Sequence, residues 1–351
     1  MEQNLAEFCR ILPKLELHAH LNGSLSNQTI KELHKTSGKP STEDNDHWKS
    51  WEKITNQIEG HSLEECFQLF NITQSLTSHP AAVFKATQDV IQEFANDGVI
   101  YLELRSTPRE VPGVMSKLEY IKTIAEAILN SSCQGILVKL IVSLDRRQGK
   151  QVAEENLDLV LNVRHQYPDI IVGTDLSGDP NKGNIDDYLP VLERARSLGL
   201  KLAVHCAEIP NQEEVMKILQ LKPERLGHAT CIHPEFGGSE TLWIKLLQWE
   251  IPVEICLTSN VRCKTVPSYA AHHLERVIAS KHPMTLATDD KGVFNTTLSQ
   301  EYRIAAECFS LSKEDLYDLS LASVEYAFCT ELEKMKMKDM FSHWKKRYLS
   351  L

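Results

Sequence analysis

Eight short apolar runs alternate with amphipathic, helix-like stretches along this 351-residue chain. Strands separated by helices form parallel sheets, because each helix carries the chain back to the start of the next strand. Eight such units favour a closed TIM (β/α)8 barrel over an open doubly wound sheet, and no Gly-x-Gly-x-x-Gly motif follows an early run. The expected strands are 14–18, 99–105, 136–144, 170–176, 200–205, 225–228, 252–257 and 284–289.

Two segments go beyond a minimal barrel. Residues 38–61 are polar with isolated aromatics, so we expect a mobile insertion after the first strand, either a lid or a disordered loop. Residues 299–351 have helical patterning and a helix start signal at Ser312-Lys313-Glu314-Asp315, so we expect extra C-terminal helices packed outside the barrel. No linker divides the chain, and residues 1–351 are expected to form a single domain.

Composition restricts the partners of the chain. A formal net charge of −10 argues against a protein that coats nucleic acid, and a small molecule is the expected partner. The N-terminus lacks a signal-peptide pattern, and Lys139 interrupts the most apolar run, so no membrane contact is expected. Nine scattered cysteines without a Cys-x-x-Cys motif indicate reduced thiols. We therefore expect a cytoplasmic monomer.

Polar side chains accumulate where the expected strands end. In a barrel enzyme the reacting groups lie at the C-terminal ends of the strands. Each of these residues taken singly could be a buried histidine, a strand cap or an acidic turn, but their joint occurrence at four strand ends is improbable by chance. The residues are His18, His20, His205, Glu208, His228, Asp289 and Asp290.

Three neutral imidazoles and one carboxylate suit zinc, which accepts nitrogen and oxygen ligands. His18 and His20 are one residue apart on a strand, so their side chains point the same way. We predict one zinc ion, which lowers the pKa of water and so supplies a nucleophile at neutral pH. The predicted ligands are His18, His20, His205 and Asp289, which leaves Glu208, His228 and Asp290 for acid and base catalysis.

Five ordered motifs resemble those of the adenosine/AMP deaminase family of metal-dependent hydrolases. They are residues 13–24 (PKLELHAHLNGS), 175–179 (DLSGD), 205–208 (HCAE), 225–228 (RLGH) and 288–290 (TDD). The resemblance implies hydrolytic removal of an amine from a purine. It implies that Glu208 protonates the ring nitrogen beside the attacked carbon and that His228 and Asp290 orient the attacking hydroxide and handle protons. It also implies contacts from the Gly178 backbone and Asp290 to the purine.

Four further segments resemble the branch of that family that acts on N6-methyl-AMP. They are residues 101–109, 145–147, 254–260 and 289–294. The expected reaction converts N6-methyl-AMP and water to IMP and methylamine, with adenosine or AMP as alternative substrates. Asp145 matches a substrate-contacting position of this branch.

Asn22 suggests that the substrate carries a phosphate. Classical adenosine deaminases have Asp there, and a carboxylate facing a phosphate would place like charges together. Ser106, Thr107, Pro108 and Arg109 follow the second strand with two hydroxyls and a guanidinium, donors that suit phosphate, although Arg109 could also be a solvated surface charge.

The remaining predicted substrate contacts are less specific. His20 is expected to touch the substrate as well as the metal. Gln74 occupies a region in which relatives carry a histidine that contacts the nucleotide, and an amide can hydrogen-bond but cannot become cationic.

Two other functions compete with a purine deaminase. A binuclear amidohydrolase generally bridges its metals with a modified Lys after the fourth strand, where this chain has Thr174-Asp175-Leu176-Ser177. An inactive nucleotide-binding scaffold would not need every ligand and Glu208. His272-His273 resembles a second metal pair, but adjacent side chains diverge, and we leave it outside the zinc site.

Overall fold

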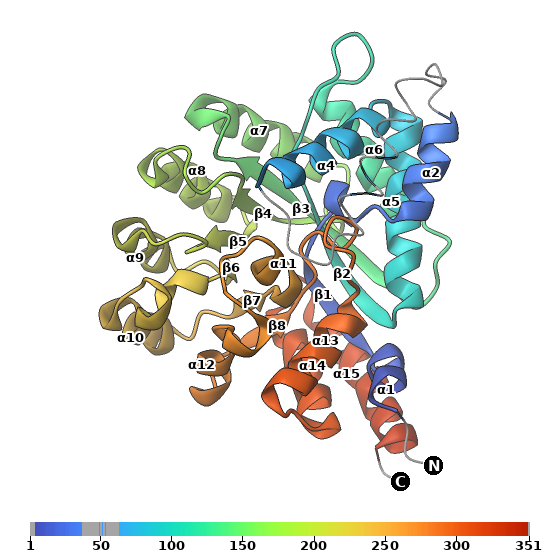
Figure 1. The fold of residues 1–351 in the computed structure, drawn as a ribbon. Coiled ribbons are helices and arrows are strands. Elements are labelled where there is room, and N and C mark those ends of the chain that lie inside the picture. The colour runs from blue at the N-terminus through green and yellow to red at the C-terminus, as the bar shows by residue number, and fades with distance from the viewer. Residues whose placement is uncertain (1–3, 37–48, 50, 52, 54–62, 350–351) are drawn as a thin grey trace.

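The computed structural model describes residues 4–36, 49, 51, 53 and 63–349 and has one eight-stranded parallel sheet in sequence order. Helices surround the strands, as Figure 1 shows, so the fold is the expected TIM (β/α)8 barrel. The strands are β1 (Lys14–His20), β2 (Val99–Ser106), β3 (Leu137–Asp145), β4 (Ile171–Ser177), β5 (Lys201–Cys206), β6 (Arg225–His228), β7 (Val253–Ile255) and β8 (Met284–Leu286).

The helices that pack around the barrel begin where the sequence offers caps. Ser116 accepts a hydrogen bond from Glu119 N at the start of α6, and Ser312 forms a capping box with Asp315 at the start of α14. The α-helices are α1 (Leu5–Ile11), α2 (Asn27–Thr36), α4 (Leu63–Leu76), α5 (Pro80–Asn96), α6 (Lys117–Leu129), α7 (Gly149–Arg164), α8 (Ile185–Ser197), α9 (Gln212–Leu221), α10 (Glu240–Trp249), α11 (Leu257–Arg262), α12 (Leu274–Ala279), α13 (Leu298–Phe309), α14 (Lys313–Tyr326) and α15 (Glu331–Tyr348).

The seventh and eighth strands are shorter than we predicted. The segment 256–257 leaves the sheet because α11 begins at Leu257, and the chain beyond Leu286 leaves it before Asp289, whose φ of 59° is left-handed. The barrel closes between β8 and β1 through the Asp289 backbone rather than a full ladder. Asp289 N donates to His18 O and His20 N donates to Asp289 O, each at 2.9 Å.

The C-terminal helices cover this last seam of the barrel. Ser320 of α14 donates a hydrogen bond to Pro13 O at the entrance to β1 (2.8 Å), and α15 packs against α14 (Figure 1). Trp344 of α15 donates to Ile11 O (2.9 Å), which holds α15 beside α1. The predicted tail of helices thus lies on the outer surface of the barrel.

Most of the predicted insertion, residues 38–61, lies outside the described residues. Trp51 is described: it is fully buried, and its indole Nε1 donates to Asn27 Oδ1 at 2.6 Å. No described helix is both long and apolar enough to cross a membrane.

Candidate active site

Four of the predicted residues converge at the C-terminal ends of the strands. His18 and His20 end β1, His205 lies near the end of β5, and Asp289 follows β8. One ligand atom from each lies within 4.8 Å of the others. Asp289 Oδ1 is 3.3 Å from Nε2 of both His18 and His20, and the Nε2 atoms of His20 and His205 are 3.2 Å apart.

This cluster fits zinc on two grounds. The donor set of three imidazoles and one carboxylate is one that zinc accepts. In addition, His18 Nε2 is buried without a hydrogen bond among the described residues, which is costly unless a metal ion uses its lone pair. A second group, His18 with His228 and Cys256, is equally close, but burial raises the pKa of the Cys256 thiol well above its usual value and disfavours the thiolate that binds metals.

Buried hydrogen-bond partners orient three of the four candidate ligands. His18 Nδ1 lies 2.7 Å from Glu254 Oε2, and His205 Nδ1 lies 2.9 Å from Asp175 Oδ1. Ser259 Oγ donates to Asp289 Oδ2 at 2.7 Å. Such contacts leave the Nε2 atoms of the histidines free for a metal and fix the orientation of each ring.

Two arginines connect these carboxylates inside the barrel. The Arg105 guanidinium contacts Glu254 and lies 3.7 Å from Asp175 Oδ1, and Arg225 Nε donates to Glu254 Oε1 at 2.6 Å. Burial alone would raise the pKa of Glu254, but Arg105 and Arg225 outweigh it and hold that pKa well below its usual range. Glu254 is therefore an anion at neutral pH. The sequence motifs contain Glu254, Arg105 and Asp175 but assign them no role. The signal that could have indicated one is a charged residue inside an apolar strand run.

The catalytic candidates lie beside the metal cluster. His228 Nε2 is 3.9 Å from Glu208 Oε2 and 3.9 Å from Asp289 Oδ2. Burial raises the pKa of Glu208 above its usual value and lowers that of His228 well below its own, so both neutral forms are favoured. A protonated carboxyl can give its proton to a bound molecule, as the predicted role of Glu208 requires.

The loop after β8 lies against the turn after β1. Gly292 N and Val293 N both donate to Gly23 O, at 2.9 and 3.1 Å. A Cβ on Gly23 would lie only 1.6 Å from Asp290 Oδ1, so glycine is required for this close approach. The packing thus places the Asp290 carboxylate against Gly23, in the turn after β1, and Asp290 follows the candidate ligand Asp289 directly in the sequence.

A second polar cluster surrounds Asn22. Asn22 Nδ2 donates to the Tyr120 hydroxyl (2.9 Å), which also lies 2.7 Å from Ser106 Oγ. Thr77 Oγ1 donates to Asn22 Oδ1 (3.2 Å), and Arg109 Nη2 donates to Thr77 Oγ1 (2.6 Å). The structure thus brings together three predicted phosphate-binding residues and adds Tyr120 and Thr77, which sequence reasoning missed because they lie on or after distant helices.

The other predicted substrate contacts lie in different settings. Asp145, at the end of β3, is nearly buried and paired with Arg147 Nη2 (2.6 Å). A Cβ on Gly178 would lie 2.4 Å from Asp145 Oδ1, which places the Gly178 backbone beside that carboxylate. Gln74 is exposed on α4. Thr107 is half-buried and Pro108 is buried in the loop after β2.

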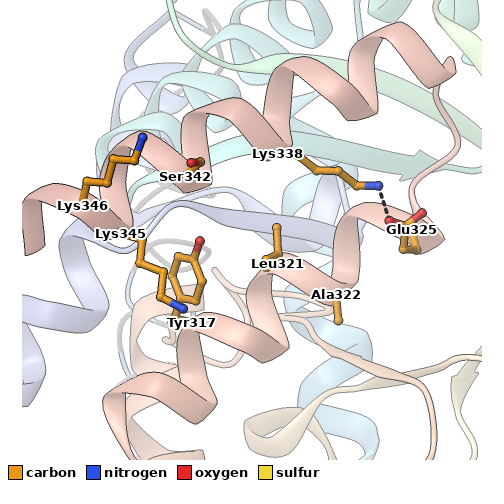
Figure 2. A pocket seen from close by; sticks show the side chains of 8 residues that line it. All are labelled: Tyr317, Leu321, Ala322, Glu325, Lys338, Ser342, Lys345 and Lys346. Atoms are coloured by element: carbon orange, nitrogen blue, oxygen red, sulfur yellow. Dashed lines mark ion pairs between the residues drawn. The ribbon is translucent and has the colours of Figure 1, made fainter. Parts of the chain in front are cut away.

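A separate pocket lies on the outside of the barrel. Figure 2 shows it between α14 and α15, where Lys338 pairs with Glu325 and the Lys345 ammonium lies 4.8 Å from the centre of the Tyr317 ring. None of the residues that line this pocket is a candidate site residue.

The fold and this arrangement agree with the comparisons. Residues 13–344 match the family described as Adenosine deaminase. The chain belongs to the adenosine deaminase family. It is therefore a hydrolytic deaminase that acts on C–N bonds, as the motifs led us to expect.

Among curated relatives, the Danio rerio protein named N6-Methyl-AMP deaminase is 44% identical over 97% of this chain and 98% of its own length. The Homo sapiens protein of that name is 43% identical over 98% and 97%. The crystal structure of Arabidopsis ADAL complexed with IMP is 35% identical, has a TM-score of 0.88, and matches 97% of this chain and 99% of its own. The expected resemblance to this branch of the family is confirmed.

Proposed function

We propose that this chain is a zinc-dependent deaminase of purine nucleoside monophosphates that converts N6-methyl-AMP and water to IMP and methylamine. The observation that carries the proposal is the joint presence of the His18, His20, His205 and Asp289 cluster and the polar cluster around Asn22. The first cluster suits hydrolysis of a C–N bond, and the second suits a phosphate. Relatives named for N6-methyl-AMP, and a related structure complexed with IMP, support this substrate class.

We assign His18, His20, His205 and Asp289 as the residues that hold one zinc ion. Zinc bound there would activate a water molecule at neutral pH. Glu254 and Asp175 keep the rings of His18 and His205 oriented toward the ion.

The neighbouring residues bind the purine and move protons. Glu208, whose pKa is raised by burial, donates a proton to the ring nitrogen beside the attacked carbon. His228 and Asp290 orient the attacking water, and the amine leaves as methylamine. The Gly178 backbone, close to Asp145, meets the far ring nitrogen of the purine.

Asn22 and Arg109 bind the phosphate together with Ser106, Thr77 and Tyr120. Neutral side chains and one guanidinium stabilise a dianion, whereas an added carboxylate would repel it. Thr107 and Pro108 continue the same loop, and Asp145 contacts the substrate from the end of β3. His20 borders both the metal and the substrate. Gln74, exposed on α4, stays a prediction.

We further propose that the enzyme acts as a monomer in the cytosol, as one domain that covers residues 1–351. The eight cysteines that the structure describes are free thiols, which fits a reducing compartment.

The direct test is turnover. Zinc-loaded protein is incubated with N6-methyl-AMP, AMP and adenosine, and the hypoxanthine chromophore is followed. We expect the highest kcat/KM for N6-methyl-AMP and little reaction of adenosine. Turnover of adenosine without N6-methyl-AMP would overturn the substrate assignment, and two tightly bound metal ions per chain would favour the binuclear alternative.

A further inference from the structure

The Nδ1 side of the His228 ring faces a series of buried, hydrogen-bonded polar groups. Its Nε2 points toward Glu208 and Asp289, whereas its Nδ1 lies 3.4 Å from Asn260 Nδ2. Asn260 Oδ1 in turn lies 3.1 Å from His272 Nε2. All three members of this series, His228, Asn260 and His272, are at most 3% exposed, so each hydrogen must go to a protein group.

The first group in this series of hydrogen bonds is a backbone N–H, which can only donate. The backbone N–H of Leu274 points at His272 Nδ1 at 3.0 Å. His272 Nδ1 is therefore an acceptor. Burial lowers the pKa of His272 well below its usual value, so the ring is neutral and carries its hydrogen on Nε2.

Two independent contacts fix the orientation of the Asn260 amide. The Nε2 hydrogen of His272 requires an acceptor, so the atom facing it is Oδ1. On the other side, Thr265 gives its single hydroxyl hydrogen to Asn260 O (3.1 Å), so Thr265 Oγ1 can only accept from Asn260 Nδ2 (3.1 Å). Both contacts require the same orientation of the amide.

The orientation of Asn260 determines what His228 can do. Asn260 Nδ2 presents a donor to His228 Nδ1, and a hydrogen on that nitrogen would place two donors face to face. His273 Nε2 donates to the His228 carbonyl at 2.9 Å and supports its backbone, whose φ of 61° is left-handed. The His272-His273 pair thus holds His228 from two directions.

We propose that Asn260 and His272 are positioning residues that fix His228 in the tautomer with its hydrogen on Nε2. Its side chain then donates a hydrogen bond to the attacking water and does not act as the base that deprotonates it. Only the role of His228 toward the attacking water rests on the proposed function. The tautomer itself follows from contacts among described residues.

The tautomer is measured directly on the zinc-loaded protein labelled with 15N-histidine. Long-range 1H–15N correlation spectra report which ring nitrogen carries the hydrogen, and loss of one ring system in His228→Gln assigns the signals. We expect the His228 hydrogen on Nε2. A hydrogen on Nδ1 in the wild-type protein would overturn the proposal whether or not N6-methyl-AMP is turned over.

Variants test the connection to the reaction. Asn260→Asp keeps the shape but presents an acceptor to His228 Nδ1, so we expect the hydrogen to move to Nδ1. We also expect kcat for N6-methyl-AMP to fall about 10²- to 10⁴-fold, as for other catalytic histidines in the wrong tautomer, with KM little changed. An unchanged tautomer or an unchanged kcat in a folded Asn260→Asp protein would contradict the proposal.

His272 offers a matched pair of variants. His272→Gln retains an N–H donor toward Asn260 Oδ1 and should keep the tautomer and most of kcat. In His272→Leu only the Thr265 contact still holds the Asn260 amide, so we expect a partial shift of the tautomer and a smaller fall in kcat than in Asn260→Asp. His282→Gln is the control, because His282 Nε2 donates to Ile251 O (2.8 Å) and touches none of these groups. Equal loss in all three variants would indicate a structural role only and would overturn the proposal.

Discussion

His18 Nδ1 and Glu254 Oε2 lie 2.7 Å apart, with both side chains fully buried. Glu254 also receives hydrogen bonds from Arg105 and Arg225, and Arg225 Nη1 donates to Tyr326 O (2.6 Å) at the end of α14. The ring that we assign as a zinc ligand is therefore connected through charged side chains to the opposite end of the barrel. A TIM barrel normally fills this space with branched apolar residues.

Replacing Glu254 with Gln should weaken zinc binding. An amide cannot stabilise the two neighbouring arginines and binds the His18 ring less strongly, so ring orientation and basicity are both lost. Loss of such a partner typically costs about 10- to 100-fold in metal affinity. Competition with a chromogenic chelator measures the change, and Glu333→Gln, which alters the more exposed Lys139 ion pair, is the control. Equal affinities for the wild-type and Glu254→Gln proteins would show that the contact does not orient the ligand.

Gly227 should not tolerate a side chain, because a side chain there would displace the His18 ring. A Cβ there would lie 2.9 Å from His18 Cε1, closer than real contacts allow, and it would push the ring out of position. Gly227→Ala should bind zinc at least about tenfold more weakly. Gly113→Ala, where a Cβ meets nothing within 4 Å but the left-handed φ of 71° strains an alanine, controls for a general loss of stability away from His18. Zinc titration of both variants decides the matter: equal affinities would mean that β6 does not constrain His18.

The barrel and its metal cluster could be predicted because their sequence signals are either local motifs or a strand–helix pattern that repeats along the chain. Alternation of runs indicates a parallel barrel, and the barrel brings the ends of β1, β5, β6 and β8 together whatever the loops do. The roles of Glu254 and Tyr120 were not predictable from those signals. Each depends on register between distant strands or on a helix packing over a loop, and neither leaves a periodic pattern. The ends of β7 and β8 were wrong because apolar residues continue past the point at which the backbone leaves the sheet.

Lys14 should make stability depend on pH above neutrality. It begins β1, and its Nζ donates to Cys9 O (2.7 Å) and Leu12 O (2.8 Å) in a buried setting. Burial lowers the pKa of Lys14 to about 8. Between that value and about 10.5 the unfolded chain binds more protons at this residue, so its contribution to stability rises with pH, by up to about 1.4 kcal/mol per pH unit.

Urea unfolding of the wild-type and Lys14→Met proteins at pH 8, 9 and 10 isolates this contribution. The free energy of unfolding of the wild type, minus that of the variant, should increase across the series. Other groups titrate in both proteins and cancel in the difference. A difference that stays constant or decreases would show that Lys14 remains charged in the fold.

Glu208→Ala should separate binding from turnover. The variant lacks the carboxyl whose pKa burial raises, so it cannot protonate the purine, and kcat should fall about 10²- to 10⁴-fold. Equilibrium dialysis should still detect bound IMP. Glu325→Ala, which removes the partner of Lys338 between α14 and α15 on the outside of the barrel, is the control. Retained turnover in Glu208→Ala would remove Glu208 from the reaction.

Asn22→Asp should shift preference away from the phosphate. The aspartate can still accept from Thr77 Oγ1 and can also accept from the Tyr120 hydroxyl, so the cluster should persist with one added negative charge. Like charges in a poorly solvated site repel by several kcal/mol, so kcat/KM for N6-methyl-AMP should fall about a hundredfold. The value for N6-methyladenosine, which lacks the phosphate, should fall much less. Asn22→Ala supplies the comparison because it removes the hydrogen bonds without adding charge. If both variants lower the two substrates' kcat/KM by the same factor, Asn22 does not distinguish nucleotide from nucleoside, and the phosphate must be recognised elsewhere.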